Sequence, residues 1–487
     1  MRTPATIRAW TTRLSWSMLA MALAYGPTPT WPRALAADST AAPPRPNVIV
    51  FLIDDLGWTD LGCFGSKLYE TPNIDRLASE GMRFTNGYAA CTVCSPTRAA
   101  IVAGKYPARL HLTDWIAGHV RKNAKLKIPD WRKYLPLEEV TLAEALKPAG
   151  YVCAHVGKWH LGDEPYYPER QGFDVNLGGD KWGAPASYFW PYGNQARRVP
   201  LGGGNEGEYL TDRLTDEAIG FIRQNRDKPF FLYFAHYAVH TPLQAKKEMV
   251  AKYEAKLASA GEAGQRCAVY AAMIQSVDES VGRVRQTLRQ LKLDRQTVVF
   301  FTSDNGGLTL PACRGLPVTS NAPLRAGKGS AYEGGVRVPW IAYWPGTIRP
   351  QSVCHTPVIS MDLYPTVLQI AGIAGDPRHR LDGESLVPLL RETGGLERQA
   401  IYWHYPHYHP GGATPYGAVR EGDFKLIEFF EDHRVELYDL GRDLGETKDL
   451  CQTMPDKAQA MRQRLHDWRR SVGAQMPTPN PDDREAK

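Results

Sequence analysis

Three continuous apolar runs of strand length stand out along the first two thirds of the chain. They cover residues 47–53, 229–234 and 297–302, and a shorter run covers 151–156. Strands that are apolar on both faces are typical of the centre of a sheet that helices cover on both sides. The pattern therefore predicts a central sheet of mostly parallel or mixed strands.

Apolar positions with helical spacing separate these runs. A stretch that begins at Thr71-Pro72 and stops at Gly81 predicts a helix with an N-cap, a proline in its first turn and a glycine end. Residues 210–224 and 267–293 predict two longer helices, of which the second is amphipathic and packs on the core. Strands that alternate with helices indicate an α/β fold with helices on both faces of the sheet.

The pattern of predicted elements changes after about residue 375. Short strand candidates follow one another at 400–403, 424–429 and 435–438, and a last helix is expected from about 456 to 471. Closely spaced strands without helices between them favour an antiparallel sheet. We expect a larger domain over residues 44–375 and a smaller C-terminal domain, with its own sheet and helix, over 376–480.

The first 36 residues have the pattern of a cleavable signal peptide. Arginines come first, an apolar run covers 14–25, and Ala34-Leu35-Ala36 ends the segment. The run is too short to span a membrane, and the small residues suit cleavage after Ala36. The sequence predicts a secreted or periplasmic protein with no integral membrane span in its mature chain. An uncleaved N-terminal anchor is the alternative.

The charge and the cysteine spacing argue against nucleic-acid binding and against a structural zinc site. Without the four arginines of the first 36 residues, 54 basic residues face 52 acidic ones, which gives no footprint for nucleic acid. The chain has eight cysteines, at positions 63, 91, 94, 153, 267, 313, 354 and 451. They lack the repeated CxxC spacing that is typical of a structural zinc site. Export makes disulfides possible, but the pairing stays open.

Two of the predicted strands end in paired oxygen-bearing side chains. Asp54-Asp55 follows the first strand, and Asp304-Asn305 follows the strand at 297–302. Ligands of open α/β sheets collect beyond the carboxyl ends of strands, so the two pairs can converge. Three carboxylates and an amide suit Ca²⁺ or Mg²⁺ better than zinc. The alternative is that each pair caps a following turn or helix.

Cys94 stands at the predicted start of a helix, because Pro96 falls in the first turn and good helix formers follow. Free N–H groups and the helix dipole favour an anion and a reactive side chain there. Arg98, one turn further on, can offer its guanidinium to the same end. A buried structural cysteine is the alternative.

Four more residues are chemical candidates in predicted loops. Lys158 and His160 lie two apart between glycines, after the strand at 151–156. His240 follows the strand at 229–234, and Lys328 stands between Gly327 and Gly329. Taken singly, each could be an ordinary solvated loop residue, and only their joint occurrence indicates a site.

These motifs together resemble the type I sulfatases of the alkaline-phosphatase-like superfamily, over about residues 47–450. The core of the resemblance is the Cys-x-Pro-x-Arg signature, present as Cys94-Ser-Pro-Thr-Arg98. Supporting segments are 54–62, 71–77, 157–162, 303–306 and 437–440. The combination is highly specific, and it covers nearly the whole mature chain.

The resemblance implies a set of roles. A separate maturation enzyme would oxidise Cys94 to formylglycine, whose hydrate is the nucleophile of the family. The metal ligands would be Asp54, Asp55, Asp304 and Asn305 with the modified Cys94, and the metal is usually one Ca²⁺. The other catalytic residues would be Arg98, Lys158, His160, His240 and Lys328.

The expected function is hydrolysis of O-sulfate esters, on a carbohydrate such as a sulfated polysaccharide or glycosaminoglycan fragment. One alternative is a phosphonate or phosphate monoester hydrolase of the same superfamily. Another is a carbohydrate-binding relative without activity, which should have lost one of the ten positions, yet none is missing. Trp115, His111, His119 and the stretch 403–409 form either a sugar-binding rim or a packed hairpin between domains.

Overall fold

The computed structural model describes residues 45–259 and 264–481, so the predicted signal peptide lies outside the described residues. An eight-stranded mixed sheet forms its centre, in the order β12-β2-β11-β10-β1-β9-β5-β6. The bounds are β12 Ser352–Cys354, β2 Met82–Phe84, β11 Trp340–Tyr343, β10 Thr297–Ser303, β1 Asn47–Ile53, β9 Phe230–Ala235, β5 Val152–Gly157 and β6 Val175–Leu177. Strands β10, β1, β9, β5 and β6 run parallel, whereas β11 is antiparallel to β10 and to β2.

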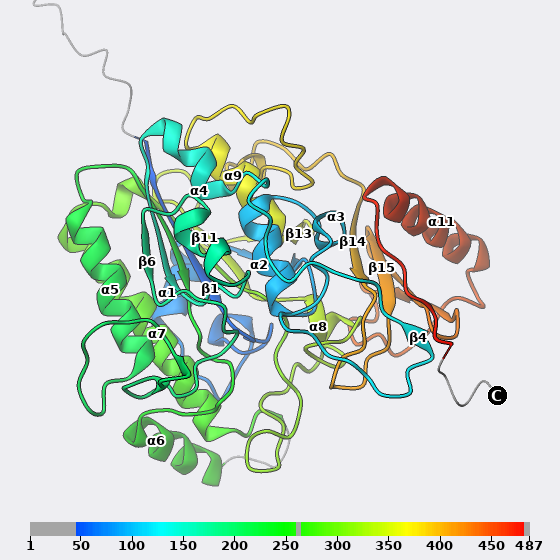
Figure 1. Cartoon of the computed structure of the whole chain (residues 1–487), viewed down its shortest axis with the longest axis horizontal. Coiled ribbons are helices and arrows are strands. Elements are labelled where there is room, and N and C mark those ends of the chain that lie inside the picture. Colours follow the sequence, from blue (N-terminus) through cyan, green and yellow to red (C-terminus); the bar gives the residue numbers. More distant parts are fainter. Residues whose placement is uncertain (1–44, 260–263, 482–487) are drawn as a thin grey trace, which may run out of the picture. The chain divides into compact units, whose positions relative to one another are not determined.

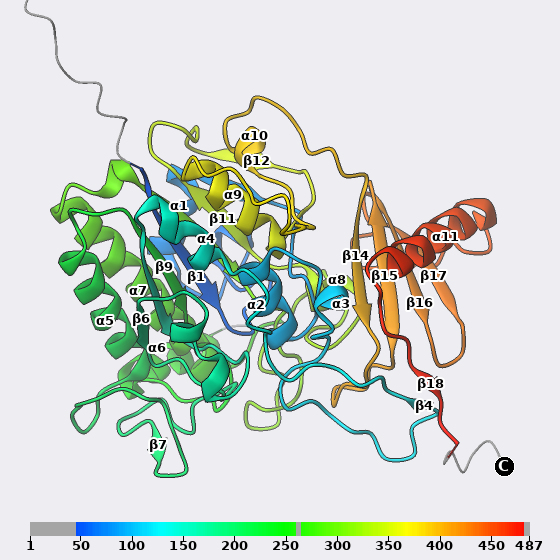
Figure 2. The same cartoon turned by 45° about the horizontal axis from the view of Figure 1, so that its top comes forward.

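Helices cover both faces of this sheet, and the alternation of side chains along β1 explains why. Ile49, Phe51 and Ile53 belong to one buried cluster, and Val48, Val50 and Leu52 belong to the other. The first face carries α1 (Pro72–Glu80), α5 (Leu210–Gln224), α6 (Lys247–Ala258) and α7 (Ala268–Gln290). The second carries α2 (Cys94–Ala103), α4 (Leu142–Leu146), α9 (Leu363–Ile370) and α10 (Val387–Leu390), as Figures 1 and 2 show.

A second, antiparallel sheet follows late in the chain. Its order is β14-β15-β16-β17, with bounds Ala400–Tyr405, Tyr416–Glu421, Phe424–Phe429 and Val435–Asp439. Helix α11 (Pro455–Ser471) lies across it in Figure 2 and contributes Met461 and Leu465 to their shared core. The predicted fold class, a central sheet between helices plus a small antiparallel sheet with a helix, is confirmed. Strand β15 was not predicted.

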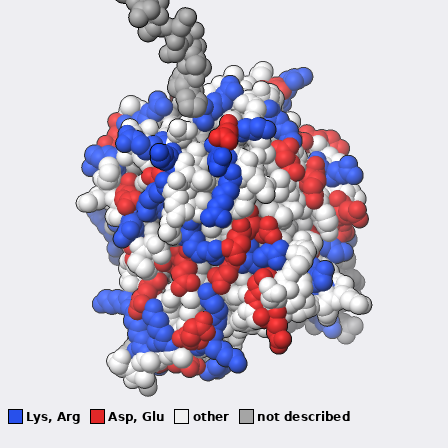
Figure 3. Space-filling view, turned by 90° about the vertical axis from the view of Figure 1, so that its left-hand side faces the viewer, with Lys and Arg blue, Asp and Glu red and all other residues white. Residues whose placement is uncertain are grey.

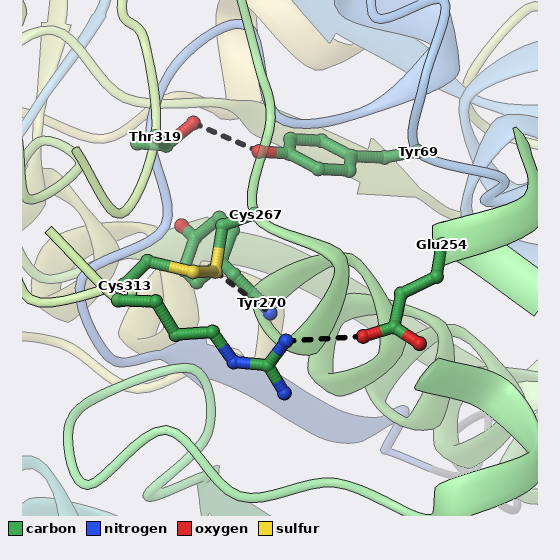
Figure 4. Close-up of a disulfide and its surroundings, with 7 residues drawn as sticks. Tyr69, Glu254, Cys267, Tyr270, Cys313 and Thr319 are labelled. Atoms are coloured by element: carbon green, nitrogen blue, oxygen red, sulfur yellow. Dashed lines mark hydrogen bonds and ion pairs between the residues drawn. A yellow bond between two sulfur atoms is a disulfide. The ribbon is translucent and has the colours of Figure 1, made fainter. Parts of the chain in front are cut away.

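One disulfide is present among the described residues. It joins Cys267, which caps the start of α7, to Cys313 in the loop after β10 (Figure 4). The same loop is held a second time by a hydrogen bond of 3.1 Å between the hydroxyls of Tyr69 and Thr319. The loop therefore leaves the sheet at β10 and is fastened to α7 before it returns to the carboxyl edge.

The surface agrees with the balanced composition. On the face drawn in Figure 3, basic and acidic side chains are interspersed, without a continuous field of one sign. Within the described residues, no helix combines the length and the apolar character that a membrane crossing needs.

Candidate active site

Four neighbouring parallel strands bring most of the predicted site residues to one edge of the sheet. Strands β1 and β10 pair in register, with Ile53 opposite Ser303, so the residues after them leave the sheet side by side. Asp304 and Asn305 follow β10, Asp54 and Asp55 follow β1, His240 follows β9, and Lys158 and His160 follow β5. The site is thus assembled by strand order rather than by proximity in sequence.

The acidic pairs meet as their strands predict. Asn305 donates from Nδ2 to Oδ1 of Asp55 at 2.8 Å, and the Asp55 backbone N–H donates to Oδ1 of Asp304 at 3.2 Å. Ligand atoms of Asp54, Asp55 and His240 lie within 4.8 Å of one another. Asp55 has a left-handed backbone, with φ of 63°, which turns its carboxylate toward the others.

The chemistry of these oxygens fits a hard divalent cation. Oδ1 of Asp54 and Oδ1 of Asn305 are buried and have no hydrogen-bond partner among the described residues. Burial raises the pKa of Asp54 to about 8, with Asp304 and Asp55 adding to a rise that Lys158 only partly offsets. Such crowded, incompletely partnered oxygens are what Ca²⁺ or Mg²⁺ binds.

Cys94 is the first residue of α2, as the sequence predicts, and it is buried. Its Sγ lies 3.4 Å from Nδ1 of His160. Nε2 of His160 contacts the carbonyl oxygen of Ile116, which can only accept, so the ring proton sits on Nε2 and Nδ1 faces Cys94 as an acceptor. Burial, together with Lys158, holds the pKa of His160 well below its usual range, so the ring is neutral.

Three cations surround the carboxylates. Arg98 donates from Nε to Oδ2 of Asp304 at 2.9 Å and from Nη1 to the carbonyl of Lys158 at 2.8 Å. Nζ of Lys158 lies 2.7 Å from Oδ2 of Asp54, and Nζ of Lys328 lies 2.6 Å from Oδ1 of Asp55. Burial works against the charge of Lys328, but Asp55 and Cys94 keep its pKa above the usual value. Three cationic side chains therefore contact the three carboxyl groups of the cluster.

A cavity of about 780 Å³ opens over this cluster. Asp55, Cys94, His160, His240 and Lys328 contribute to its inner end. Its walls include Trp115, Trp182, Arg197, Leu308, Leu310 and His409. The wall residues Trp182, Arg197, Leu308 and Leu310 were not predicted, because they lie in loops or, for Arg197, on a strand of two residues, and neither carries a periodic signal.

The sequence left two interpretations for the segments 111–119 and 403–409, a rim of the cavity or a packed hairpin, and the structure shows some residues of each kind. Trp115 and His409 line the cavity, as a rim would. Trp403 is buried and donates from Nε1 to the carbonyl of Ala89 at 2.8 Å, and His404 and His407 are buried as well. Residues 403–407 therefore serve packing and, like His111 and His119, are not among the residues that line the cavity.

A mixed sheet between helices, with acidic pairs and a helix N-terminus at the carboxyl edge of its parallel strands, defines the alkaline-phosphatase-like class of hydrolases. Within that class, the chain belongs to the sulfatase family, since the family model described as Sulfatase matches residues 46–373. A second model, N-sulphoglucosamine sulphohydrolase, C-terminal, matches residues 327–471.

Named relatives agree with this assignment. A sulfatase of Formosa agariphila is 34% identical over 87% of this chain and 88% of its own. Human N-acetylgalactosamine-6-sulfatase is 36% identical over 75% of this chain and 69% of its own. Human arylsulfatase A is 34% identical over 88% of this chain and 89% of its own. The chain is a sulfatase, and the reaction it catalyses is sulfate ester hydrolysis.

Solved structures support the fold. The crystal structure of Ps i-CgsB superposes with a TM-score of 0.73 at 30% identity, over 87% of this chain and 93% of that one. A phosphonate monoester hydrolase of Agrobacterium radiobacter superposes with a TM-score of 0.64 at 20% identity, over 88% of this chain and 96% of that one. The second likeness concerns the fold alone.

Proposed function

We propose that this sulfatase removes O-sulfate groups from a sulfated carbohydrate, with a formylglycine derived from Cys94 as nucleophile and one Ca²⁺ as cofactor. The observation that carries the proposal is the position of Cys94. It faces His160 at 3.4 Å, at a helix N-terminus beside the paired cations and carboxylates. The carbohydrate part rests on relatives named N-acetylgalactosamine-6-sulfatase and on a solved relative in complex with k-i-k-neocarrahexaose.

The metal would be held by Asp54, Asp55, Asp304, Asn305 and the modified residue 94. When bound, it would add positive charge to the site, polarise the ester and favour ionisation of the nucleophile. Arg98 and Lys158 hold the carboxylates in place through the contacts at 2.9 Å and 2.7 Å, and they add positive charge beside the sulfate oxygens.

Proton movement falls to the two histidines and Lys328. His160 presents the lone pair of Nδ1 to residue 94 and is therefore the base at that position. Lys328, which is protonated, delivers a proton to the departing alcohol, or His240 does so after taking one up, since burial lowers its pKa to about 3 and its Nδ1 proton faces the carbonyl of Thr241. His240→Ala and Lys328→Ala identify the donor. In the variant that lacks it, kcat should fall more on alkyl sulfates than on aryl sulfates, because the poorer alkoxide leaving group needs the proton more.

The decisive experiment is peptide mass spectrometry across residue 94, after production together with a maturation enzyme. We expect conversion of the thiol to an aldehyde, and loss of aryl sulfate hydrolysis in Cys94→Ala. Cys91→Ala is the matched control, since Cys91 is equally buried and lies outside the cavity lining. Full activity in a protein whose Cys94 is still a thiol would refute the formylglycine proposal.

The rival activity is hydrolysis of phosphate or phosphonate monoesters. Matched rates on aryl sulfate and aryl phosphate separate the two, and kcat/KM should be higher for the sulfate. The proposal also includes export by residues 1–36 and a division into domains 44–375 and 376–480. N-terminal sequencing of the secreted protein would test the first, and limited proteolysis would test the second.

A further inference from the structure

Arg197 is a cation in the cavity wall that the reaction described above does not use. It lies on β8 (Arg197–Arg198), in a hairpin with β7 (Gly193–Asn194). From there it donates from Nη2 to the carbonyl of Ala184 at 2.8 Å. The residue before Ala184 is Gly183, whose Cα packs so closely on the His160 ring that a Cβ there would overlap it. Arg197 is therefore anchored one residue away from a segment that touches the base.

Within the described part of the chain, Arg197 forms no ion pair, although its charge is felt by Asp180 nearby. Among the described residues, no carboxylate lies within 4.0 Å of its guanidinium, whereas Lys328 is paired with Asp55 at 2.6 Å. Asp180, an acidic neighbour, instead accepts from the Trp182 backbone at 2.8 Å. Nε of Arg197 is buried and has no hydrogen-bond partner in the described part of the chain. A sheltered guanidinium in this condition is a site for an anion.

The neighbouring wall suits a sugar ring. The guanidinium carbon of Arg197 lies 5.1 Å from the Trp182 ring centroid, and Trp182 and Trp115 both line the cavity. Leu308 and Leu310 add apolar surface. A ring that packs on Trp182 would lie beside the Arg197 guanidinium, in the same cavity as Cys94.

We propose that Arg197 binds a second anionic group of the substrate, a carboxylate or a second sulfate, so that the preferred substrate is a sulfated sugar with at least two negative charges. This inference rests on the proposed carbohydrate sulfatase function. A carboxylate and a sulfate both offer oxygen atoms that accept hydrogen bonds from a guanidinium. Substrates that carry one or the other distinguish the two.

The test compares three synthetic sugar sulfates: one neutral apart from its scissile sulfate, one with an added carboxylate and one with an added second sulfate. In Arg197→Gln, the ratio of kcat/KM for the preferred doubly charged sugar to that for the singly charged sugar should fall about 10- to 100-fold. Arg198→Gln is the matched control. Arg198 is exposed, faces the Trp190 ring at 6.0 Å and should leave the ratio unchanged.

Outcomes are separable from those of the proposed function. If Arg197→Gln leaves the ratio unchanged, whether because kcat/KM falls equally on all three sugars or does not fall at all, the role of Arg197 is refuted. If the matured protein hydrolyses aryl sulfate but none of the sugars, the carbohydrate proposal fails. Binding of the same sugars to Cys94→Ala, measured by calorimetry, still tests Arg197. Equal affinity for singly and doubly charged sugars would then reject the inference.

Discussion

Replacing Lys425 by methionine should destabilise the protein strongly and in a pH-dependent way. Nζ of Lys425 on β16 lies 2.9 Å from Glu333 and 3.1 Å from Glu446, and all three side chains are fully buried. Glu333 keeps other partners, since Tyr88 donates to it at 2.7 Å and Arg337 lies at 3.2 Å. Glu446 would lose its compensating cation, and an uncompensated buried charge costs about 3–5 kcal/mol in the free energy of unfolding.

The direction of the pH effect follows from the pKa of Glu446. Burial raises it to about 7, although Lys425 works in the opposite direction, and without Lys425 it would rise further. A folded-state pKa above the unfolded one means that the folded protein takes up a proton first as pH falls. The cost in Lys425→Met is therefore greatest above that pKa, and it should shrink between pH 8.5 and pH 5.5.

Urea unfolding, followed by tryptophan fluorescence at both pH values, measures this cost. Lys448→Met is the matched control, because Lys448 is exposed and no ion pair of its side chain occurs among the described residues. Its unfolding free energy should change by less than about 0.5 kcal/mol. A Lys425→Met protein that loses less than about 1 kcal/mol, or the same amount at both pH values, would refute the reasoning.

Three further predictions concern the site and its supports. Chelation should lower both the melting temperature and the activity, and added Ca²⁺ should restore both; a melting temperature that ignores chelator and calcium alike would speak against a bound metal. Gly183→Ala should lower kcat about 100-fold with little change in urea stability, because its methyl group would displace the His160 ring, and unchanged kcat would contradict this. Replacing Cys267 and Cys313 together by serine should cost about 4 kcal/mol, since the disulfide closes a 46-residue separation, and unfolding curves with and without reductant check the value.

Much of the fold could be predicted because the central strands are apolar on both faces. The run at 47–53 coincides with β1, and the helix over 210–224 coincides with α5. Strand β15 escaped prediction because it carries the buried charge of Arg420, which contacts Tyr88, and a glycine at 417. Burial of a paired charge removes the apolar alternation on which a strand prediction depends.

The candidate site residues could be named from the sequence, and their roles stay predictions, but their geometry could not be derived from it. The acidic pairs stand out in the sequence because each follows an apolar run. Their meeting depends on Ile53 lying opposite Ser303, 250 positions away, and no local pattern encodes that register. The left-handed backbone of His160, with φ of 61°, and the contact of its ring with Ile116 depend equally on tertiary packing. These contacts set which ring nitrogen faces residue 94.

Most candidate site residues and the cavity-wall residues lie in different parts of the fold, and this separation bears on how substrate specificity can change. The ends of β10, β1, β9 and β5 carry most of the candidate site residues. Of the cavity wall, Trp182 and Arg197 lie between β6 and α5, and Leu308 lies in the segment after β10. Substitutions in these wall segments that spare Gly183 can change which sulfate ester is accepted without altering the candidate residues at the strand ends. Libraries confined to residues 184–198 and 308–312, which leave Gly183 and Cys313 unchanged, are the place to search for new specificities.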